Sequence, residues 1–428
     1  MAVDSLKNAW NVADLRKKIG YTLLMFLIFR IGAHIPTPFL DRDILNQMFG
    51  SGAMMNFMDT ISGGSFKSLS VFALSITPYI TASIIFQLLT VVIPTLERLS
   101  KEGDYGRKKI TQYTRYATVG LGFIQAIGLT YGIRGAVTIT NPAMKWPTYL
   151  LIALVLTAGT AFLMWLGEAI TEKGIGNGIS LIIFAGIVSR VPSALASLWG
   201  MLRVGEINAL SLIGLALIVA FITAGVIYVQ EGQRRVTVQY AKRVVGRRVY
   251  GGQSSHIPLK VNQAGVIPVI FAMSLLAFPQ AITSWMPTSG FARFVNTWFS
   301  MNGSLTSIPY LLLYGALIIF FAYFYTSITF NPTDVADNLK KYGGFIPGLR
   351  PGRPTAEYLS KILNRITLAG GLFLALIAVL PTLVIGLTGL KNIYFGGTSL
   401  LIVVGVALDT MKQIESQLMS RHYQGFMK

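Results

Sequence analysis

Long apolar runs recur along the whole chain and constrain its fold more than any other feature. A helix needs roughly 20 mostly apolar residues to cross a bilayer, and ten runs approach that length. These runs are 19–39, 71–95, 116–133, 149–167, 179–198, 209–229, 264–283, 308–329, 366–388 and 394–411. Strands of a transmembrane barrel would instead alternate apolar and polar residues over about ten positions. The runs therefore predict an all-α polytopic membrane protein with about ten transmembrane helices.

The composition agrees with a bilayer as the main solvent. Hydrophobic residues make up 53% of the chain and charged residues only 12%, whereas soluble domains carry about 25% charged residues. The net charge of +19 is concentrated before the first run and in the even connections, which include 230–263 and 330–365. Because basic residues stay on the cytoplasmic side, the even connections and both termini are predicted to be cytoplasmic.

The residues that most enzymes and ion-coupled carriers require are missing from this sequence. It contains no cysteine, its three histidines lie in different segments, and no P-loop or hydrolase motif occurs. Carboxylates are nearly absent from the apolar runs, although they usually mark the sites of coupled carriers. We therefore expect no catalytic site, no metal and no cofactor. Arg30 lies near the outer end of the first run, where snorkelling is the expected explanation.

The second run has an unusual construction for a membrane span. Its first part, "SGGSFKSLSVFALSITPY", has two adjacent glycines near its start and contains several polar residues. Proline removes a helical hydrogen bond and disfavours helix in the residue before it, so Pro78 predicts a break near Thr77. Non-helical backbone at membrane depth requires cover from protein or water. The segment is therefore expected to be covered by protein or by water.

The connection 230–263 is longer than a link between two spans requires. Alternation in "RRVTVQYAKRVV" predicts a short projecting hairpin. The basic residues of this connection can simply set the topology, or they can form a docking surface for an acidic partner. The length of the connection favours docking.

Several motifs in this chain resemble those of the SecY family, the channel subunit of the bacterial protein translocase. They are "TPYITASIIFQLLTVVIPTLERLSKEGDYGRKKITQYTRY", "GIGNGISLIIFAGIV", "GRRVYGGQSSHIPLKVNQAGVIPVIFA", "GLRPGRPTAEYL" and "FGGTSLLIVVGVALD". The resemblance runs from about residue 10 to the C-terminus, with the motifs in their expected order. It implies a channel for unfolded preproteins and for the lateral release of transmembrane segments into the bacterial cytoplasmic membrane.

The resemblance also implies an architecture of two inverted five-helix halves around a central pore. The halves would be 1–205 and 206–428, hinged near Gly205. The part of the second run at about 61–74 would be a short helix that plugs the pore from outside. Its candidate plug residues are Gly63, Gly64, Phe66, Leu69 and Phe72.

Isoleucines at helical spacing are candidates for the pore constriction. Ile80 and Ile84 stand one turn apart, and Ile183 and Ile187 repeat that spacing. The resemblance adds Ile270 and Ile402, which gives a ring of six apolar residues. The alternative is that these isoleucines merely face lipid or neighbouring helices. Serine, threonine, glycine and glutamine on the same runs favour the pore.

The resemblance places a lateral gate between the second and seventh spans. Gln87 and Asn262 are the candidate gate residues, since a polar side chain in a membrane needs a partner. A hydrogen bond between helices contributes about 0.6 kcal/mol on average. Such a bond would favour a closed gate that an apolar signal peptide can still open.

The resemblance implies several partners for this protein. They are the small subunits SecE and SecG, the ATPase SecA, the ribosome with its rRNA, signal peptides, unfolded preproteins and membrane lipids. Candidate docking residues for SecA and the ribosome are Arg243, Arg247, Arg248 and Arg350. Three other classes remain open from the residues alone: a carrier for small solutes, an intramembrane hydrolase and a receptor with basic loops.

Overall fold

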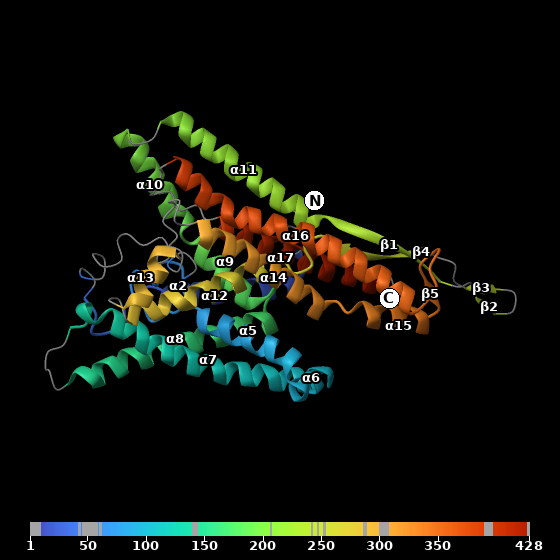
Figure 1. The fold of residues 1–428 in the computed structure, drawn as a ribbon, viewed down its shortest axis with the longest axis horizontal. Helices are drawn as coiled ribbons and strands as arrows, with labels where there is room; N and C mark the ends of the chain where they lie inside the picture. The colour runs from blue at the N-terminus through green and yellow to red at the C-terminus, as the bar shows by residue number, and fades with distance from the viewer. Residues whose placement is uncertain are drawn as a thin grey trace.

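The computed structural model describes residues 10–41, 44, 59, 62–138, 144–205, 208–240, 243–245, 248–250, 254–285, 289–298, 308–388 and 397–425. Helices dominate these ranges, and a slender β-ribbon projects from one end of the helical body (Figure 1). The first group of helices is α2 (Ala13–Gly32), α5 (Thr77–Val92), α6 (Pro94–Lys101), α7 (Asp104–Gly132), α8 (Lys145–Lys173), α9 (Gly178–Val188) and α10 (Val191–Val204). A 3-10 turn, η1 (Arg134–Ala136), follows α7.

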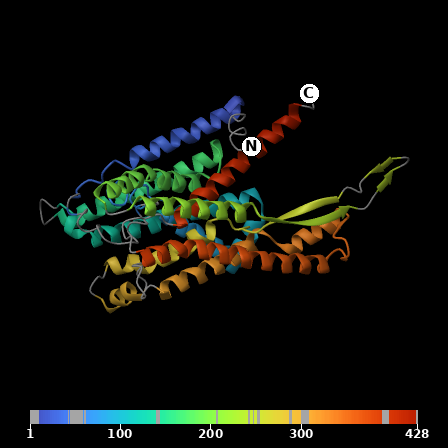
Figure 2. The same cartoon turned by 90° about the horizontal axis from the view of Figure 1, so that it is seen from above.

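The second group of helices follows Gly205, which ends α10 in a left-handed conformation with a φ of 78°. Its members are α11 (Ala209–Glu231), α12 (Ile267–Trp285), α13 (Gly290–Trp298), α14 (Ile308–Thr329), α15 (Pro332–Lys341), α16 (Arg353–Thr388) and α17 (Gly397–Gly425). Figure 2 shows most of the helices of both groups running roughly along the long axis of the body.

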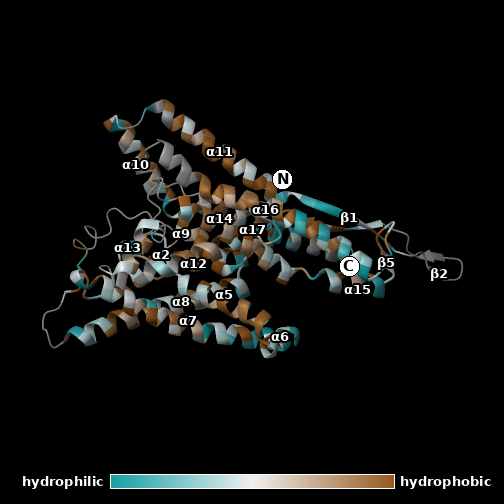
Figure 3. Cartoon of the chain, viewed as in Figure 1, coloured by the Kyte–Doolittle hydropathy of each residue, from teal (hydrophilic) through white to brown (hydrophobic). Residues whose placement is uncertain are grey.

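A helix overlaps each of the ten apolar runs, but the helices differ in length. Within the described residues, five helical segments are long and apolar enough to cross a membrane, and six if α5 and α6 count as one bent span. The fold is thus a helical membrane protein with several apolar helices. Figure 3 shows hydrophobic residues along the bundle and hydrophilic ones on β1 and the neighbouring helix ends.

Proline and capping residues fix several helix starts. Proline occupies the first turn of α5, α6, α10 and α15, where its missing N–H costs no hydrogen bond. The side chain of Asn177 accepts a hydrogen bond from the Ser180 N–H at the start of α9, which is a typical N-cap. Between α5 and α6 the chain bends by 100° at Ile93.

The largest hydrophobic cluster lies where the two groups of helices meet. It draws buried residues from α2, α5, α8, α9 and from α11, α12, α14, α16 and α17. Helix α12 packs against α5 and α7, and α17 packs against α9. These contacts join the two groups of helices and bring segments far apart in sequence into one core.

The connections 230–263 and 330–365 fold together. Strand β1 (Gln233–Tyr240) pairs antiparallel with β4 (Ser254–Lys260) and with β5 (Gly344–Phe345), in the order β4-β1-β5. Farther out, β2 (Arg243–Val245) pairs with β3 (Arg248–Tyr250). Val236, Val238 and Leu259 of the sheet pack against α16 in a separate small cluster. We call the paired strands β1 to β4, which the charge distribution predicts to be cytoplasmic, the cytoplasmic ribbon.

Candidate functional site

The six candidate pore isoleucines come together in the largest hydrophobic cluster. Ile80, Ile183, Ile187 and Ile402 are buried members of this cluster, and the half-buried Ile84 and Ile270 pack against it. They come from four helices: α5, α9, α12 and α17. The contacts of α5 with α12 and of α9 with α17 bring these helices into one cluster. None of the six is among the large exposed hydrophobic side chains of the described residues, so they do not face lipid, and packing against neighbouring helices remains the alternative to a pore ring.

The candidate plug region has a different backbone from the one expected. Residues 62–76 form consecutive turns with a single bridge between Ser70 and Pro36. The expectation of a short helix at 61–74 is therefore wrong for the described part, and residue 61 lies outside the described residues. Positive φ angles at Gly63, Gly64, Leu69 and Ser75 explain this, because repeated left-handed residues interrupt a right-handed helix. We call residues 62–76 the plug segment.

The plug segment is fixed by aromatic stacking. The ring of Phe72 lies between those of Phe29 and Phe162, with centroids 6.2 Å and 5.9 Å away. It also covers Gly32, where an added Cβ would lie 2.1 Å from the Phe72 ring. Phe72 and Ile76 belong to the same cluster as the six isoleucines, so the plug segment and the candidate ring share one apolar core.

The outer part of the plug segment packs against another set of side chains. Leu69 is buried with Ile152 and Leu156 of α8, and Phe66 packs against the same cluster. The backbone of Val71 runs so close to Gly159 that an added Cβ there would lie 2.0 Å from the Val71 carbonyl oxygen. The plug segment is therefore held along most of its length by α2, α7 and α8.

Charged residues fasten the beginning of the plug segment. Asp59 is fully buried and forms an ion pair with Arg190, in the junction between α9 and α10. Its Oδ1 also accepts a hydrogen bond from the Lys67 N–H at 2.8 Å, and its carbonyl accepts one from the Gly64 N–H at 2.9 Å. One carboxylate thus links the plug segment to the end of α9.

Arg30 has a different role from the one that its sequence position suggested. Its Nη1 donates hydrogen bonds to the Gly63 carbonyl at 2.9 Å and to Ser189 Oγ at 3.2 Å. The expectation of simple snorkelling is therefore wrong, because the guanidinium is tied to the plug segment and to α9. We call Arg30, Asp59 and Arg190 the plug latch.

The plug latch escaped the sequence reasoning, although one signal was visible. Arg190 lies inside the apolar run 179–198, where an unpaired charge is costly. A charged residue in such a position calls for a partner, and the first external connection supplies one in Asp59. Its identity depended on the folded chain, since 131 residues separate the two positions.

The candidate gate residues do not bond to each other. The Nδ2 of Asn262 donates a hydrogen bond to the Gly265 carbonyl at 2.9 Å, in the turn that precedes α12. The Oε1 of Gln87, on α5, is buried without a hydrogen-bond partner. The expected bond between helices is therefore absent, and Asn262 lies before the seventh span instead of on it. The boundary between α5 and α12, which we call the α5–α12 seam, is instead held by the packing of these two helices.

The predicted hairpin is present, and the structure extends it into the cytoplasmic ribbon. Arg243 pairs in backbone register with Tyr250, and Arg248 pairs with Val245. Arg247 falls outside the described residues, between β2 and β3. Strands β2 and β3 lie at the end of the ribbon farthest from the helices (Figure 1).

Arg350 occupies a defined turn at the start of α16. Gly348 and Gly352 on either side have φ angles of 83° and 102°, which favour glycine. The buried Thr355 donates a hydrogen bond from Oγ1 to the Arg350 carbonyl at 2.9 Å. The backbone is thereby fixed, and the Arg350 side chain is exposed.

Within the described part of the chain, no group of three or more His, Asp or Glu residues could hold a metal ion. Among the described residues, Asp59 is the only charged residue whose side chain is buried. Its ion pair with Arg190 gives Asp59 a structural role.

Comparison with known proteins identifies the family. The SecY family model matches residues 70–411. A protein translocase subunit SecY from Streptomyces coelicolor is 49% identical over 98% of both chains. Those from Halalkalibacterium halodurans and Bacillus subtilis are 50% and 48% identical over 99% of both chains.

Solved structures agree at the level of the fold. A structure described as a protein conducting channel has a TM-score of 0.67 at 20% identity, covering 95% of this chain and 93% of that one. Sec61 in a canine ribosome-channel complex has a TM-score of 0.65 at 19% identity, with the same coverage. The expected resemblance is confirmed: the chain belongs to the SecY family of protein translocase subunits.

Proposed function

We propose that this protein is a protein-conducting channel of the bacterial cytoplasmic membrane, which translocates unfolded preproteins and releases transmembrane segments sideways into the bilayer. One observation carries the proposal: the plug segment shares a single apolar cluster with six isoleucines from four helices. A narrow apolar constriction excludes water and ions when empty. Branched, flexible side chains also seal around many different polypeptides, because they bind none of them through specific polar groups.

The architecture proposed for this function is two inverted five-helix halves, 1–205 and 206–428. The left-handed Gly205 at the end of α10 supports a hinge between them. The seams of α5 with α12 and of α9 with α17 support two halves that meet around a central path. The plug segment would close this path from outside, and the plug latch would hold it there.

The seam between α5 and α12 is the proposed lateral gate. Because no hydrogen bond joins Gln87 to Asn262, apolar contacts keep the gate closed. An entering leucine gains about 0.3–0.6 kcal/mol in the bilayer, and a central arginine costs about 2.5–3.5 kcal/mol. A signal peptide with about ten apolar residues can therefore outweigh these contacts, and selection follows from partitioning without bond chemistry.

The cytoplasmic ribbon and the turn around Arg350 form the proposed docking surface. Pairing of β1 with β5 supports one surface made from both loops. The basic residues of these loops support a cytoplasmic position for the loops and for both termini by the positive-inside rule. We propose the ATPase SecA and the ribosome as its partners, and SecE and SecG as companion subunits. Arg243, Arg247, Arg248 and Arg350 would pair with carboxylates or rRNA phosphates, for which the arginine fork is suited.

Reconstitution tests the channel directly. Vesicles that contain this protein with its companion subunits and SecA should take up an unfolded preprotein and should not accumulate a panel of small solutes. A carrier for small solutes would give the opposite result.

A further inference from the structure

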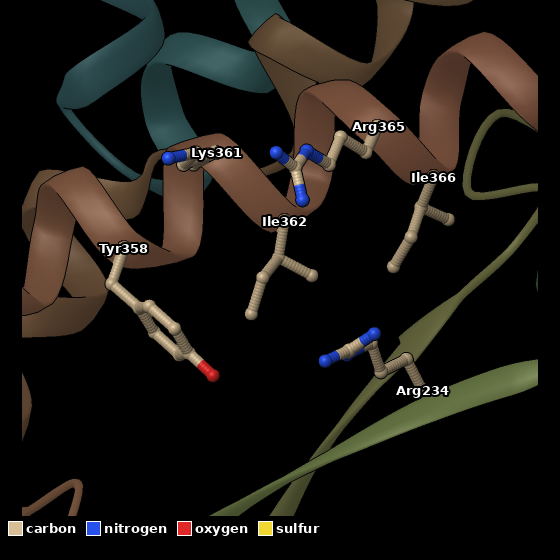
Figure 4. A pocket seen from close by; sticks show the side chains of 6 residues that line it. All are labelled: Arg234, Tyr358, Lys361, Ile362, Arg365 and Ile366. Atoms are coloured by element: carbon tan, nitrogen blue, oxygen red, sulfur yellow. The ribbon is translucent and has the colours of Figure 1, made fainter.

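An open cleft of about 260 Å³ lies between the base of the cytoplasmic ribbon and the first turns of α16. It is lined by Arg234 of β1 and by Tyr358, Lys361, Ile362, Arg365 and Ile366 of α16. Figure 4 shows the Arg234 side chain and the Tyr358 hydroxyl directed into the same space, with Ile362 and Ile366 above it. The cleft therefore combines cations, one hydroxyl and an apolar wall.

The fold fixes the cations on both sides of this cleft. Alternate residues of a strand face the same side, so Arg234 shares the face of Val236 and Val238, which pack toward α16. Lys361 and Arg365 are four residues apart, one turn along α16. Packing of the sheet on α16 thus places Arg234 on the same cleft that Lys361 and Arg365 line from α16.

The three cations have no protein counter-ion among the described residues. No ion pair joins Arg234, Lys361 or Arg365 to an acidic side chain in that part of the chain. Glu357, the acidic residue closest to them on α16, pairs with Arg353 at 3.1 Å. Like charges held together in this way favour an anionic ligand.

An exposed apolar stripe continues from the cleft along α16. Leu368, Leu372 and Leu376 are 45%, 52% and 61% exposed. They follow Arg365 in successive steps of three, four and four residues, which places them on the same helix face as Arg365. Tyr358, which is 37% exposed, stands on the other side of the cations, as aromatic residues do at membrane interfaces. The cations thus lie where the lipid-facing surface of a span begins.

We propose that this cleft binds the phosphate headgroup of an anionic phospholipid, whose acyl chains lie along Leu368, Leu372 and Leu376. Arg234 and Arg365 would donate charge-assisted hydrogen bonds to the phosphate oxygens, and Lys361 would add a point charge. The adjoining apolar stripe favours a lipid over an RNA phosphate, because acyl chains can cover the stripe and a nucleic acid backbone cannot. Basic pockets at the cytoplasmic side of spans bind such headgroups in general.

Bound lipid would link β1 to the membrane surface. Arg234 lies one residue after Gln233, where β1 begins, so a headgroup held by Arg234 and Arg365 would anchor the base of the cytoplasmic ribbon. The lipid would thereby set the position of the ribbon relative to the bilayer.

Native mass spectrometry of the intact protein in detergent tests the proposal. The protein is titrated with phosphatidylglycerol or with phosphatidylcholine, and the bound lipid is counted. We expect a preference for phosphatidylglycerol that falls about five-fold for each cation neutralised, in Arg234→Gln, Arg365→Gln and the triple variant with Lys361→Gln.

The matched control removes equal charge elsewhere on the basic loops, in Lys108→Gln with Lys340→Gln and Lys341→Gln, and should keep the preference. The single variants preserve the test if the triple variant fails to insert. An equal loss in control and cleft variants would overturn the proposal. Displacement of phosphatidylglycerol by millimolar inorganic phosphate would overturn it in favour of a free anion. Loss of ribosome binding with unchanged lipid preference would overturn it in favour of RNA.

Discussion

Arg190 and Asp59 form an ion pair that joins the end of α9 to the residues leading into the plug segment. The Asp59 side chain has no exposed surface, and that of Arg190 is 34% exposed. Removal of one partner from a buried pair costs about 3–5 kcal/mol, and the partial exposure of Arg190 places this pair toward the lower value. The release of the plug segment that we propose would have to break this pair, at a cost toward that lower value.

Asp59→Asn should release the plug segment while leaving the helices intact. The amide cannot neutralise Arg190, so the docked state loses its main electrostatic contact and the empty channel should conduct ions more often. Conductance of the purified protein in a planar bilayer measures this effect. Glu357→Gln, which breaks an exposed pair with Arg353, is the matched control. Equal conductance in the two variants would contradict the role of the plug latch.

Replacement of Ile84, Ile187 and Ile270 by glycine should make the empty channel leak ions and small solutes. The loss of three branched side chains widens the apolar constriction, so water enters it more easily. Glycine also costs about 1 kcal/mol per helical position. The exposed isoleucines Ile124, Ile213 and Ile328, changed to glycine together, carry the same helix cost without touching the cluster. A triple variant as tight as this control would remove the six isoleucines from the seal.

Two substitutions at the α5–α12 seam should shift the signal requirement in opposite directions. Gln87→Leu removes a buried oxygen that has no partner, a group that costs about 1–3 kcal/mol, so the closed seam becomes more stable. Ile270→Asn places an amide in the apolar cluster and destabilises the closed seam. Export of substrates with graded signal hydrophobicity should show a higher threshold for the first variant and a lower one for the second. A shift in the same direction for both would contradict an apolar gate.

Asn262→Leu should also alter this threshold, but through the turn that precedes α12. The substitution removes the hydrogen bond to the Gly265 carbonyl and so loosens the start of α12. The same export series measures the effect. An unchanged threshold would show that this turn does not influence the gate.

Charge reversal on the cytoplasmic surface should separate the two proposed partners. Arg350→Glu should cripple SecA-driven export, because the fixed turn presents this side chain to solvent. Arg247→Glu with Arg248→Glu should weaken ribosome binding and change its dependence on salt. Vesicle translocation with SecA and co-sedimentation with ribosomes are the two assays. Lys340→Glu with Lys341→Glu, on the exposed end of α15, provides a control for loop charge alone.

The sequence predicted the features that depend on local composition and on solvent. Apolar runs of about twenty residues are long enough to cross a bilayer, and a helix overlaps each of them. Proline and glycine predicted the break before Thr77, and alternation predicted the hairpin of the cytoplasmic ribbon, because both signals act through the backbone of neighbouring residues. The motifs of the SecY family contain the candidate pore and gate residues.

Only the tertiary structure decided which polar groups become partners. It paired Asp59 with Arg190, tied Arg30 to Gly63 and left Gln87 without the bond expected with Asn262. It also replaced the expected plug helix by a series of turns. The physical reason is that a buried polar group takes whichever partner the packed chain brings within about 3 Å. Helical packing sets that distance across more than a hundred residues of sequence, and local propensity carries no information about it.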